Sequence, residues 1–313
     1  MSQMHPPSLY LTIRQQMDRV LQDVRLGKAL EPKNMRSVLE QLLDAILHDN
    51  KNLTFLARLQ DHQNALVTKS VNVTVFTLVF AKHLGLRRDQ LIPLGLGALL
   101  HPLGLLQVPS KILSKSTPLS KEERDLIHQY PQQGYELLAS QGGFDHQVLD
   151  IVLHHQERVK GTGYPEQLQG REISFLARMV AITSVYEALT RNRNYRQALN
   201  PAQALGLLYR WRYRDFDQRL VEKFIQSLGV YPPGCLVELS DASLAVVHAT
   251  QVEPKSAPLV KRLTNANLEP LPQEELLDLT TAELSICKVV DPSAPKLEVL
   301  LNELARKSPD FPV

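Results

Sequence analysis

The sequence has few cysteines and almost no excess of charge. Only Cys235 and Cys287 occur in 313 residues, and neither belongs to a Cys-x-x-Cys pair. This pattern argues against a disulfide framework or a zinc ribbon and is typical of a reducing compartment. The 35 basic and 33 acidic residues leave a formal net charge of +2. That balance does not favour nucleic acid or an acidic membrane surface as the main partner.

Long apolar stretches are also missing. The longest run, residues 91–100, is much shorter than the ~20 residues that a membrane-spanning helix needs. Residues 1–8 contain Pro6 and Pro7 and no apolar core of a signal peptide. Because 43% of the residues are hydrophobic, a buried core is expected. The sequence therefore predicts a globular cytoplasmic protein without membrane insertion.

Two amphipathic helices are predicted at the N-terminus. One apolar stripe consists of residues 13, 17, 20, 21 and 24, and a second consists of residues 35, 38, 39, 42 and 46. Both stripes have helical spacing, and Gly27 and Pro32 separate them. Packing into the core is one interpretation of these stripes, and a homodimer interface is the alternative.

Helical signals continue from about residue 63 to residue 228. A capping box at residues 120–123 predicts the start of a helix. The sequence Asn-Pro-Ala-Gln at 200–203 predicts another start, and Gly229 predicts a stop. This long central part is therefore expected to form one helical bundle.

The residue pattern changes from helical to strand-like after residue 231. Short apolar or β-branched runs at 235–239, 244–248 and 259–263 predict a small sheet of about three strands, and residues 296–305 predict a final helix. We therefore expect a mainly α-helical chain with three parts: an N-terminal helical region (1–58), a helical domain (59–230) and a small β-containing tail with a terminal helix (231–313).

Histidines are the first candidates for chemistry, because imidazole is the commonest metal ligand. His101 follows an apolar helical run, His154 and His155 follow another, and a Gly-Thr-Gly-Tyr-Pro loop comes next at 161–165. A single helical histidine is more often packed or solvated than functional. Only the ordered combination of these features indicates a site.

This ordered set of motifs resembles the HD-GYP domain over roughly residues 53–247. The matching segments are residues 70–73, 101–104, 108–109, 130–134, 155–165, 170–173, 177–178, 186–190, 193–196 and 229–239. The family contains bacterial phosphodiesterases that open cyclic di-GMP. The resemblance implies an HD-type helical bundle, and a site where two or three divalent metals activate a water that attacks phosphorus.

Most of the metal-ligand positions that the resemblance implies are replaced. Two of the implied ligands are retained, as His101 and His155. The replaced ligand positions carry Lys69, Pro102, Tyr130, Gln156 and Ser184, and neighbouring motif positions carry Asn64, Leu105 and Lys160. Neutral or cationic side chains do not screen two divalent ions from each other. We therefore expect no multinuclear metal centre and interpret His101 and His155 as relics of one; a single weakly held metal is the alternative.

The His-His-Glu element of the family has two possible registers here. Counting back from the Gly-Tyr-Pro loop without a gap places it on His155, Gln156 and Glu157, so that one histidine is lost. Matching the pair to His154 and His155 instead requires an insertion of one residue. We adopt the ungapped register.

Cations remain at several positions near the implied site. Arg193 and Arg196 match positions where the family contacts phosphate, and guanidinium groups suit phosphate well. With Lys69 and Lys160 they would give a nucleotide a positive lining. Ordinary surface or helix-end salt bridges are the alternative for the two arginines.

Gly163, Tyr164 and Pro165 keep the name-giving loop intact. In the family this loop is associated with contacts to diguanylate cyclases that carry GGDEF domains. The sequence therefore predicts a docking loop for such partners. The alternative is structural: Gly163 for an unusual backbone angle and Pro165 for stiffness.

These observations lead to a functional hypothesis. We expect a non-catalytic signalling module, not an enzyme, which binds partner proteins and has cyclic di-GMP as a candidate ligand without hydrolysing it. One alternative is an active cyclic di-GMP phosphodiesterase with an unconventional metal site. The other is a purely structural adaptor.

Overall fold

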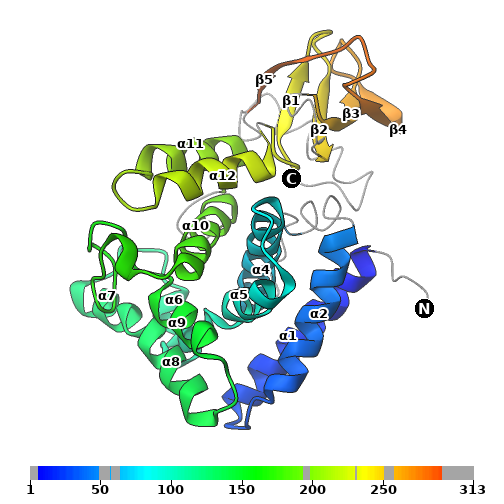
Figure 1. The fold of residues 1–313 in the computed structure, drawn as a ribbon. Helices are drawn as coiled ribbons and strands as arrows, with labels where there is room; N and C mark the ends of the chain where they lie inside the picture. Colours follow the sequence, from blue (N-terminus) through cyan, green and yellow to red (C-terminus); the bar gives the residue numbers. More distant parts are fainter. Residues whose placement is uncertain are drawn as a thin grey trace.

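The chain forms a helical body followed by one antiparallel sheet. The computed structural model describes residues 6–48, 57, 64–192, 198–229, 231–249 and 257–290. Figure 1 shows the sheet standing at one end of the body, next to α11 and α12. The larger helices are α1 (Pro6–Arg25), α2 (Pro32–His48), α4 (Ala65–His83), α5 (Arg88–Leu100), α7 (Lys121–His128), α8 (Tyr130–Gln141), α9 (His146–His154), α10 (Phe175–Thr190), α11 (Pro201–Trp211) and α12 (Gln218–Leu228).

Three short helical turns complete the body: η1 (Leu103–Gln107), α6 (Ser110–Leu113) and η2 (Gly170–Glu172). The strands are β1 (Leu236–Leu239), β2 (Leu244–Ala249), β3 (Leu259–Thr264), β4 (Pro270–Asp278) and β5 (Ile286–Val289). The prediction of a mainly α-helical chain with C-terminal β structure is confirmed.

The two N-terminal helices belong to the main core. Ile13 and Met17 of α1 and Leu39 and Ile46 of α2 are fully buried, and they join one hydrophobic cluster that extends to α12. Helix α1 packs against α4, and α2 packs against both α4 and α5. The predicted apolar stripes therefore serve the core of this chain.

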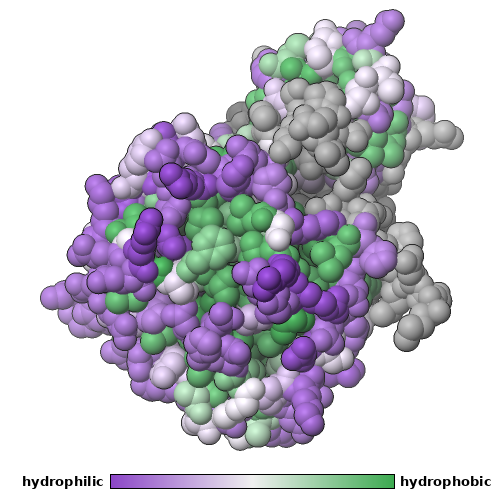
Figure 2. Space-filling model, in the orientation of Figure 1, coloured by the Kyte–Doolittle hydropathy of each residue, from purple (hydrophilic) through white to green (hydrophobic). Residues whose placement is uncertain are grey.

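The helical stretches at the centre of the body are apolar and largely buried. Two stretches, Ala65–His83 and Arg88–Gln107, are long and apolar enough to cross a membrane by length and composition, and 78% of each is buried inside the fold. The core helix of a globular protein gives the same signal. Figure 2 shows that apolar side chains also reach the surface in the middle of the helical body, where polar side chains surround them.

The predicted helix boundaries are formed by local hydrogen bonds. The Ser120 hydroxyl accepts a bond of 3.2 Å from the Glu123 backbone N–H, which completes the capping box of α7. Asn200 caps α11 by accepting a bond of 2.9 Å from the N–H of Ala202. Gly229 ends α12 with a φ of 83°, in the region that favours glycine. These three predictions are confirmed.

The sheet has five strands in the order β4-β3-β2-β1-β5, so the expectation of about three strands is wrong. β1, β2 and β3 match the predicted runs, whereas β4 contains Pro270 and Pro272 and lacks apolar alternation. β5 has only four residues and pairs with β1 from far along the chain. β4 therefore carries no clear local signal, and β5 carries only a short one. The predicted final helix at 296–305 lies outside the described residues.

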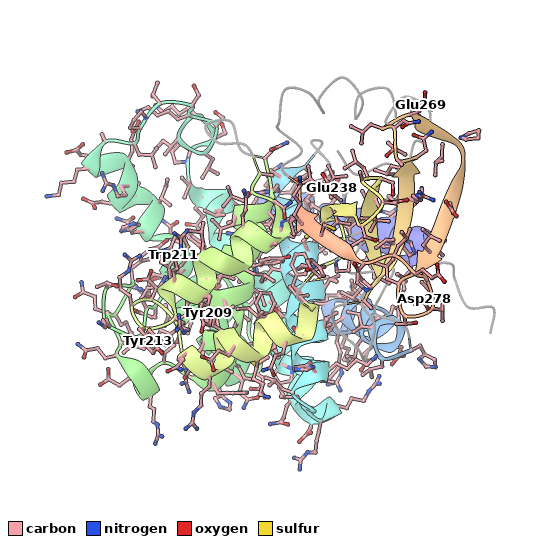
Figure 3. All side chains as sticks on the ribbon, turned by 90° about the horizontal axis from the view of Figure 1, so that it is seen from above. Tyr209, Trp211, Tyr213, Glu238, Glu269 and Asp278 are labelled. Atoms are coloured by element: carbon pink, nitrogen blue, oxygen red, sulfur yellow. The ribbon has the colours of Figure 1, made fainter. Side chains whose placement is uncertain are left out.

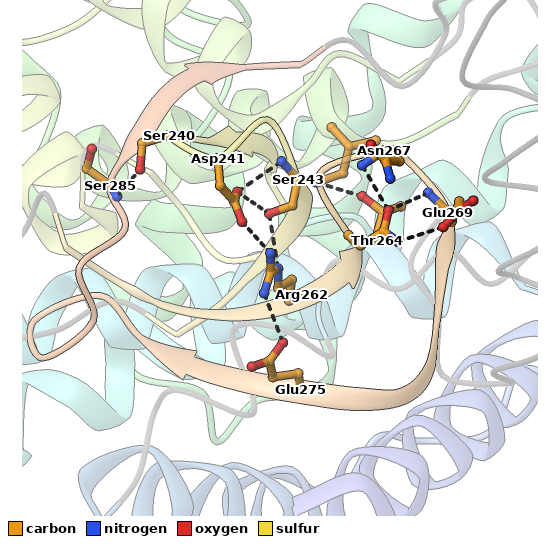
Figure 4. A network of polar contacts seen from close by, with 11 residues as sticks. Ser240, Asp241, Ser243, Arg262, Thr264, Asn267, Glu269, Glu275 and Ser285 are labelled. Carbon is orange, nitrogen blue, oxygen red and sulfur yellow. Dashed lines mark hydrogen bonds and ion pairs between the residues drawn. The ribbon is translucent and has the colours of Figure 1, made fainter.

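Polar contacts hold the register at one end of the sheet (Figure 4). The Arg262 guanidinium of β3 contacts the Asp241 carboxylate in the β1–β2 turn and lies 3.4 Å from a carboxylate oxygen of Glu275 on β4. It also donates a bond of 3.1 Å to the Ser243 hydroxyl. One side chain thus connects β3 and β4 with the β1–β2 turn.

A group of aromatic residues lies at the C-terminal end of α11 and just after it. Figure 3 shows Tyr209, Trp211 and Tyr213 apart from the labelled acidic residues of the sheet. The Arg212 guanidinium carbon lies 3.5 Å from the centre of the Tyr209 ring and 4.3 Å from that of Tyr213. Arginine faces aromatic rings favourably at these distances, so the contacts stabilise the turn between α11 and α12.

Candidate functional site

Two histidines meet in the interior of the helical body. His101 follows the last residue of α5, and His155 follows the last residue of α9. Both are fully buried, and their ring centres lie 4.9 Å apart in an edge-to-face arrangement. The structure thus brings together the two imidazoles that the sequence comparison singled out.

Backbone carbonyls fix the tautomer of both rings. Nδ1 of His101 lies 2.6 Å from the carbonyl oxygen of Ala98, and Nδ1 of His155 lies 2.9 Å from that of Val152. Each Nδ1 therefore carries the hydrogen, and each Nε2 offers a lone pair. Nε2 of His155 accepts from the Tyr130 hydroxyl at 2.5 Å, whereas Nε2 of His101 has no partner among the described residues.

Burial, together with a nearby cation, keeps these imidazoles neutral. Lys69 on α4 is 8% exposed, and its Nζ lies 5.7 Å from the centre of the Tyr130 ring. Burial, and then the charge of Lys69, lower the pKa of His155 to about 3 and that of His101 well below its ordinary value. Both rings are therefore neutral at physiological pH.

A chain of hydrogen bonds links this cluster to a second cation. Nη2 of Arg158 donates to Oε1 of Gln156 at 3.2 Å, and Nε2 of Gln156 donates to the Tyr130 hydroxyl at 2.7 Å. Burial lowers the pKa of Arg158, but a guanidinium stays charged at neutral pH. Gln156 and Arg158 are half-buried. The sequence does not reveal this linkage, because the motif shows Gln156 only as a replaced ligand position.

His154 points away from this cluster. Its Nδ1 lies 2.7 Å from an oxygen of Asp150, and its Nε2 lies 3.1 Å from an oxygen of Glu166, just after the Gly-Tyr-Pro loop. Burial lowers the pKa of His154, but the hydrogen bonds and charges of Asp150 and Glu166 outweigh burial and raise it. This geometry supports the ungapped register, in which His155 is the histidine of the site.

The His154 contacts predict a pH-dependent stability. Because the pKa of His154 is raised in the folded chain, its contribution is complete below about pH 6.5, the ordinary histidine value. The contribution is lost as pH rises through the raised pKa. The loss of melting temperature in His154→Gln should thus be larger at about pH 6 than at about pH 9. The exposed His48→Gln variant serves as control, and a loss independent of pH would contradict the expectation.

The Gly-Tyr-Pro loop is packed from two sides. The Tyr164 ring stacks on His128 with ring centres 4.1 Å apart and an interplanar angle of 15°, and burial raises the pKa of Tyr164 to about 12. A Cβ at Gly163 would lie 2.4 Å from the backbone nitrogen of Arg158. Close approach, not an unusual backbone angle, therefore requires this glycine, and the earlier interpretation of its φ is corrected. Whether the loop also docks a partner stays a prediction.

The remaining sequence candidates do not all join the cluster. Lys160 is exposed, and its backbone forms an isolated bridge with Gln169. Arg193 and Arg196 lie outside the described residues. Asn64 caps α4 and donates a bond of 2.6 Å to Asp18, which gives it a structural role.

The described residues do not fit a centre of two or three metals. No group of three or more His, Cys, Asp or Glu side chains suited to a metal converges within the described ranges. Nε2 of His155 is already occupied by the Tyr130 hydroxyl, and the nearby charge is the Lys69 ammonium. A divalent cation would be repelled by that charge. The absence of a multinuclear centre stays a prediction, which elemental analysis can test.

Comparison with known proteins gives a consistent set of relatives. The HD domain family matches residues 54–220. The cyclic di-GMP phosphodiesterase PA4108 of Pseudomonas aeruginosa is 33% identical over 264 residues, which cover 84% of this chain and 63% of that protein. The cyclic di-GMP phosphodiesterase PdeB of Borreliella burgdorferi is 30% identical over 184 residues, which cover 59% and 48%. The chain thus spans less than two thirds of the length of these relatives.

A solved structure supports the fold. Bd1817, an HDG"Y"P protein from Bdellovibrio bacteriovorus, matches with a TM-score of 0.60 at 18% identity, covering 72% of this chain and 71% of that one. The predicted HD-type helical fold with a β-containing C-terminal tail is confirmed by this likeness, and the tail is an antiparallel sheet.

The functional hypothesis drawn from the sequence needs correction. The prediction of a non-catalytic module that is not an enzyme is wrong, because the relatives described above are phosphodiesterases. Lost ligands argue against one arrangement of metals, but hydrolysis of a phosphodiester also depends on cations that hold phosphate and on groups that accept protons.

Proposed function

Because this chain belongs to the HD domain family, which matches residues 54–220, we propose that it binds cyclic di-GMP at the cluster around His101 and His155 and hydrolyses it. The observation that carries the proposal is the Nε2 lone pair of His101, which is buried beside the charge of Lys69 and has no partner among the described residues. The similarity to cyclic di-GMP phosphodiesterases supports this nucleotide as the substrate.

The residues of the cluster suit two needs of phosphodiester hydrolysis. Lys69 offers a positive charge for the non-bridging oxygens of phosphate. Nε2 of His101 accepts the proton of the attacking water while the water oxygen bonds to phosphorus. The imidazolium then returns the proton to the leaving oxygen as the bond to phosphorus breaks.

Binding of the negatively charged substrate would make the two imidazoles stronger bases. Burial is the main cause of the low pKa of both His101 and His155, and the charge of Lys69 is the second. A phosphodiester anion bound near Lys69 offsets this second cause and so raises the pKa of both imidazoles. The empty site is therefore a weaker base than the occupied one.

The proposed hydrolysis assigns no step to a metal ion, and metal content is a quantity to be measured. HD-family enzymes use divalent metals to activate water, but the cluster around His101, Tyr130 and His155 does not fit a multinuclear centre, so no step is derived through one. We expect fewer than two metal ions per chain by elemental analysis. An activity that a chelator abolishes would show that an unconventional metal site exists.

The finer parts of the proposal rest on sequence alone. Arg193 and Arg196 remain candidates for phosphate contacts, together with Lys69, whereas the exposed Lys160 is a candidate for the rim of the site. Docking of a GGDEF-domain diguanylate cyclase on the loop around Tyr164 is a further proposal. Loss of partner capture in Tyr164→Ala would support it.

The experiment that tests the function is product formation. The purified chain is incubated with cyclic di-GMP, and linear dinucleotide is quantified by chromatography. We expect His101→Ala to lower the rate by about 100-fold or more, because general base catalysis typically contributes 10²–10⁴-fold. His146→Ala, with a side chain that is 88% exposed, is the control. Absence of product from the unmodified chain would overturn the proposal.

A further inference from the structure

The hydrogen-bond chain at the site runs in one direction. Arg158 donates to Gln156, Gln156 donates to Tyr130, and the Tyr130 hydroxyl donates to Nε2 of His155. The far end is the Nδ1–H of His155, which donates to the carbonyl of Val152. Each link orients the next one and strengthens it. The state of Arg158 is therefore transmitted to His155.

The charged guanidinium of Arg158 donates its hydrogen bonds to neutral acceptors. Its guanidinium donates hydrogen bonds to the backbone carbonyl of Glu157 at 2.8 Å and to Oε1 of Gln156 at 3.2 Å, and its central carbon lies 5.1 Å from the centre of the Phe216 ring. Burial lowers the pKa of Arg158, and the nearby Tyr164, Tyr130, Asp215 and Glu157 offset only part of this effect. Neither of the two carboxylates forms an ion pair with Arg158 within the described ranges. A charge of this kind favours an anion.

The cluster itself is closed. His101 and His155 are fully buried, Tyr130 is 2% exposed and Lys69 is 8% exposed. A phosphate group coming from solvent therefore cannot contact either Nε2 before a covering side chain moves. Gln156 and Arg158 are the less buried members of the chain of hydrogen bonds, so an anion meets them first.

We propose that Arg158 is the first phosphate contact of the nucleotide, and that this contact withdraws Gln156 and Tyr130 from His155 and opens the site. The inference rests on the proposed binding of cyclic di-GMP. Arginine and phosphate form charge-assisted and frequently bidentate pairs, whereas Gln156 offers the guanidinium a single neutral acceptor. Phosphate therefore competes well with the Gln156 amide, whose bond of 3.2 Å is at the long end of the normal range.

The consequence at the site is specific. Once Gln156 no longer bonds Arg158, its amide no longer fixes the Tyr130 hydroxyl toward His155. Nε2 of His155 then joins Nε2 of His101 as a free acceptor, with the Lys69 charge beside them. Arg158 therefore binds the phosphate directly, Gln156 acts as a positioning residue, and Tyr130 blocks or frees His155.

Direct binding measurements on the full chain test this. Inorganic phosphate and cyclic di-GMP are titrated by calorimetry against the unmodified chain, Arg158→Gln and Gln156→Glu. We expect both variants to lose phosphate binding and to bind cyclic di-GMP at least about tenfold more weakly. Gln156→Glu gives Arg158 an internal carboxylate partner without a change of size, so it remains informative if Arg158→Gln does not fold. Tyr130→Phe should bind at least as tightly as the unmodified chain, since no hydroxyl needs to leave His155.

Arg36→Gln is the matched control, because it removes the same charge from an exposed ion pair with Glu40 and should leave both affinities unchanged. Equal affinities in the unmodified chain, Arg158→Gln and Gln156→Glu would overturn the inference, as would weaker binding by Tyr130→Phe. Nucleotide binding without any product would refute only the proposed hydrolysis. Product formation with undiminished affinity in both variants would refute only the role of Arg158.

Discussion

Gly104→Ala is expected to destabilise the chain by roughly 3 kcal/mol or more, at the upper end of the cost of overpacking. A Cβ at this position would lie 1.8 Å from the carbonyl oxygen of Tyr130 and 2.7 Å from the backbone nitrogen of Gly134. Both obstacles are backbone atoms, so a change of rotamer cannot relieve the clash. Turn η1 and helix α8 would have to move apart.

The same movement would reach the candidate site. Tyr130 supplies the hydroxyl that bonds His155, and its carbonyl is the atom that Gly104→Ala displaces. The variant should therefore lose affinity for cyclic di-GMP as well as stability. Thermal unfolding measures the first effect, with a loss of roughly 6–12 °C expected at about 2–4 °C per kcal/mol for a chain of this size.

Gly206→Ala is the matched control for this substitution. Gly206 lies inside α11, and a Cβ there would meet nothing within 4 Å. Alanine is favoured over glycine inside a helix by about 0.5–1 kcal/mol, so this variant should melt at a higher temperature. If both alanine variants changed stability in the same direction, the close approach of η1 and α8 would not be the cause.

The parts of the fold that the sequence predicts are those with local causes. The caps at Ser120, Asn200 and Gly229 follow from hydrogen bonds within a few residues. β5 is different, because its four residues are held by pairing with β1, about 50 residues earlier in the chain. Gly163 is an intermediate case, because its close contacts are with backbone atoms of residues 156–158 and arise only when the loop folds back on them.

The candidate site also has a part that the sequence predicts and a part that only the packing of the helices reveals. Motif order identifies His101 and His155, and the structure places their rings in contact. Motif order does not reveal that Tyr130 occupies the lone pair of His155, or that Gln156 connects it to Arg158. These contacts depend on how α8 and α9 pack. A substituted motif position therefore says which group is lost, but not what the new side chain does.

Arg191→Met is expected to destabilise the chain by about 3–5 kcal/mol, the usual cost of leaving a buried charge without its partner. The Glu187 side chain on α10 is 1% exposed, and Nε of Arg191 lies 3.1 Å from its carboxylate. The pair forms no well-aligned hydrogen bond, so charge is the main attraction. Arg191 also donates a bond of 2.5 Å to the carbonyl of Ala65, which connects α10 to the start of α4.

A second substitution separates these two roles of Arg191. Glu187→Gln removes the buried charge, so the double variant should be more stable than Arg191→Met alone. Any loss that remains in the double variant measures the contact with Ala65. Arg36→Met is the control: the Arg36–Glu40 pair has the same four-residue spacing and a distance of 3.0 Å, but both side chains are exposed. Its loss should stay below about 1 kcal/mol. Equal losses at the two pairs would show that burial of Glu187 does not decide the effect.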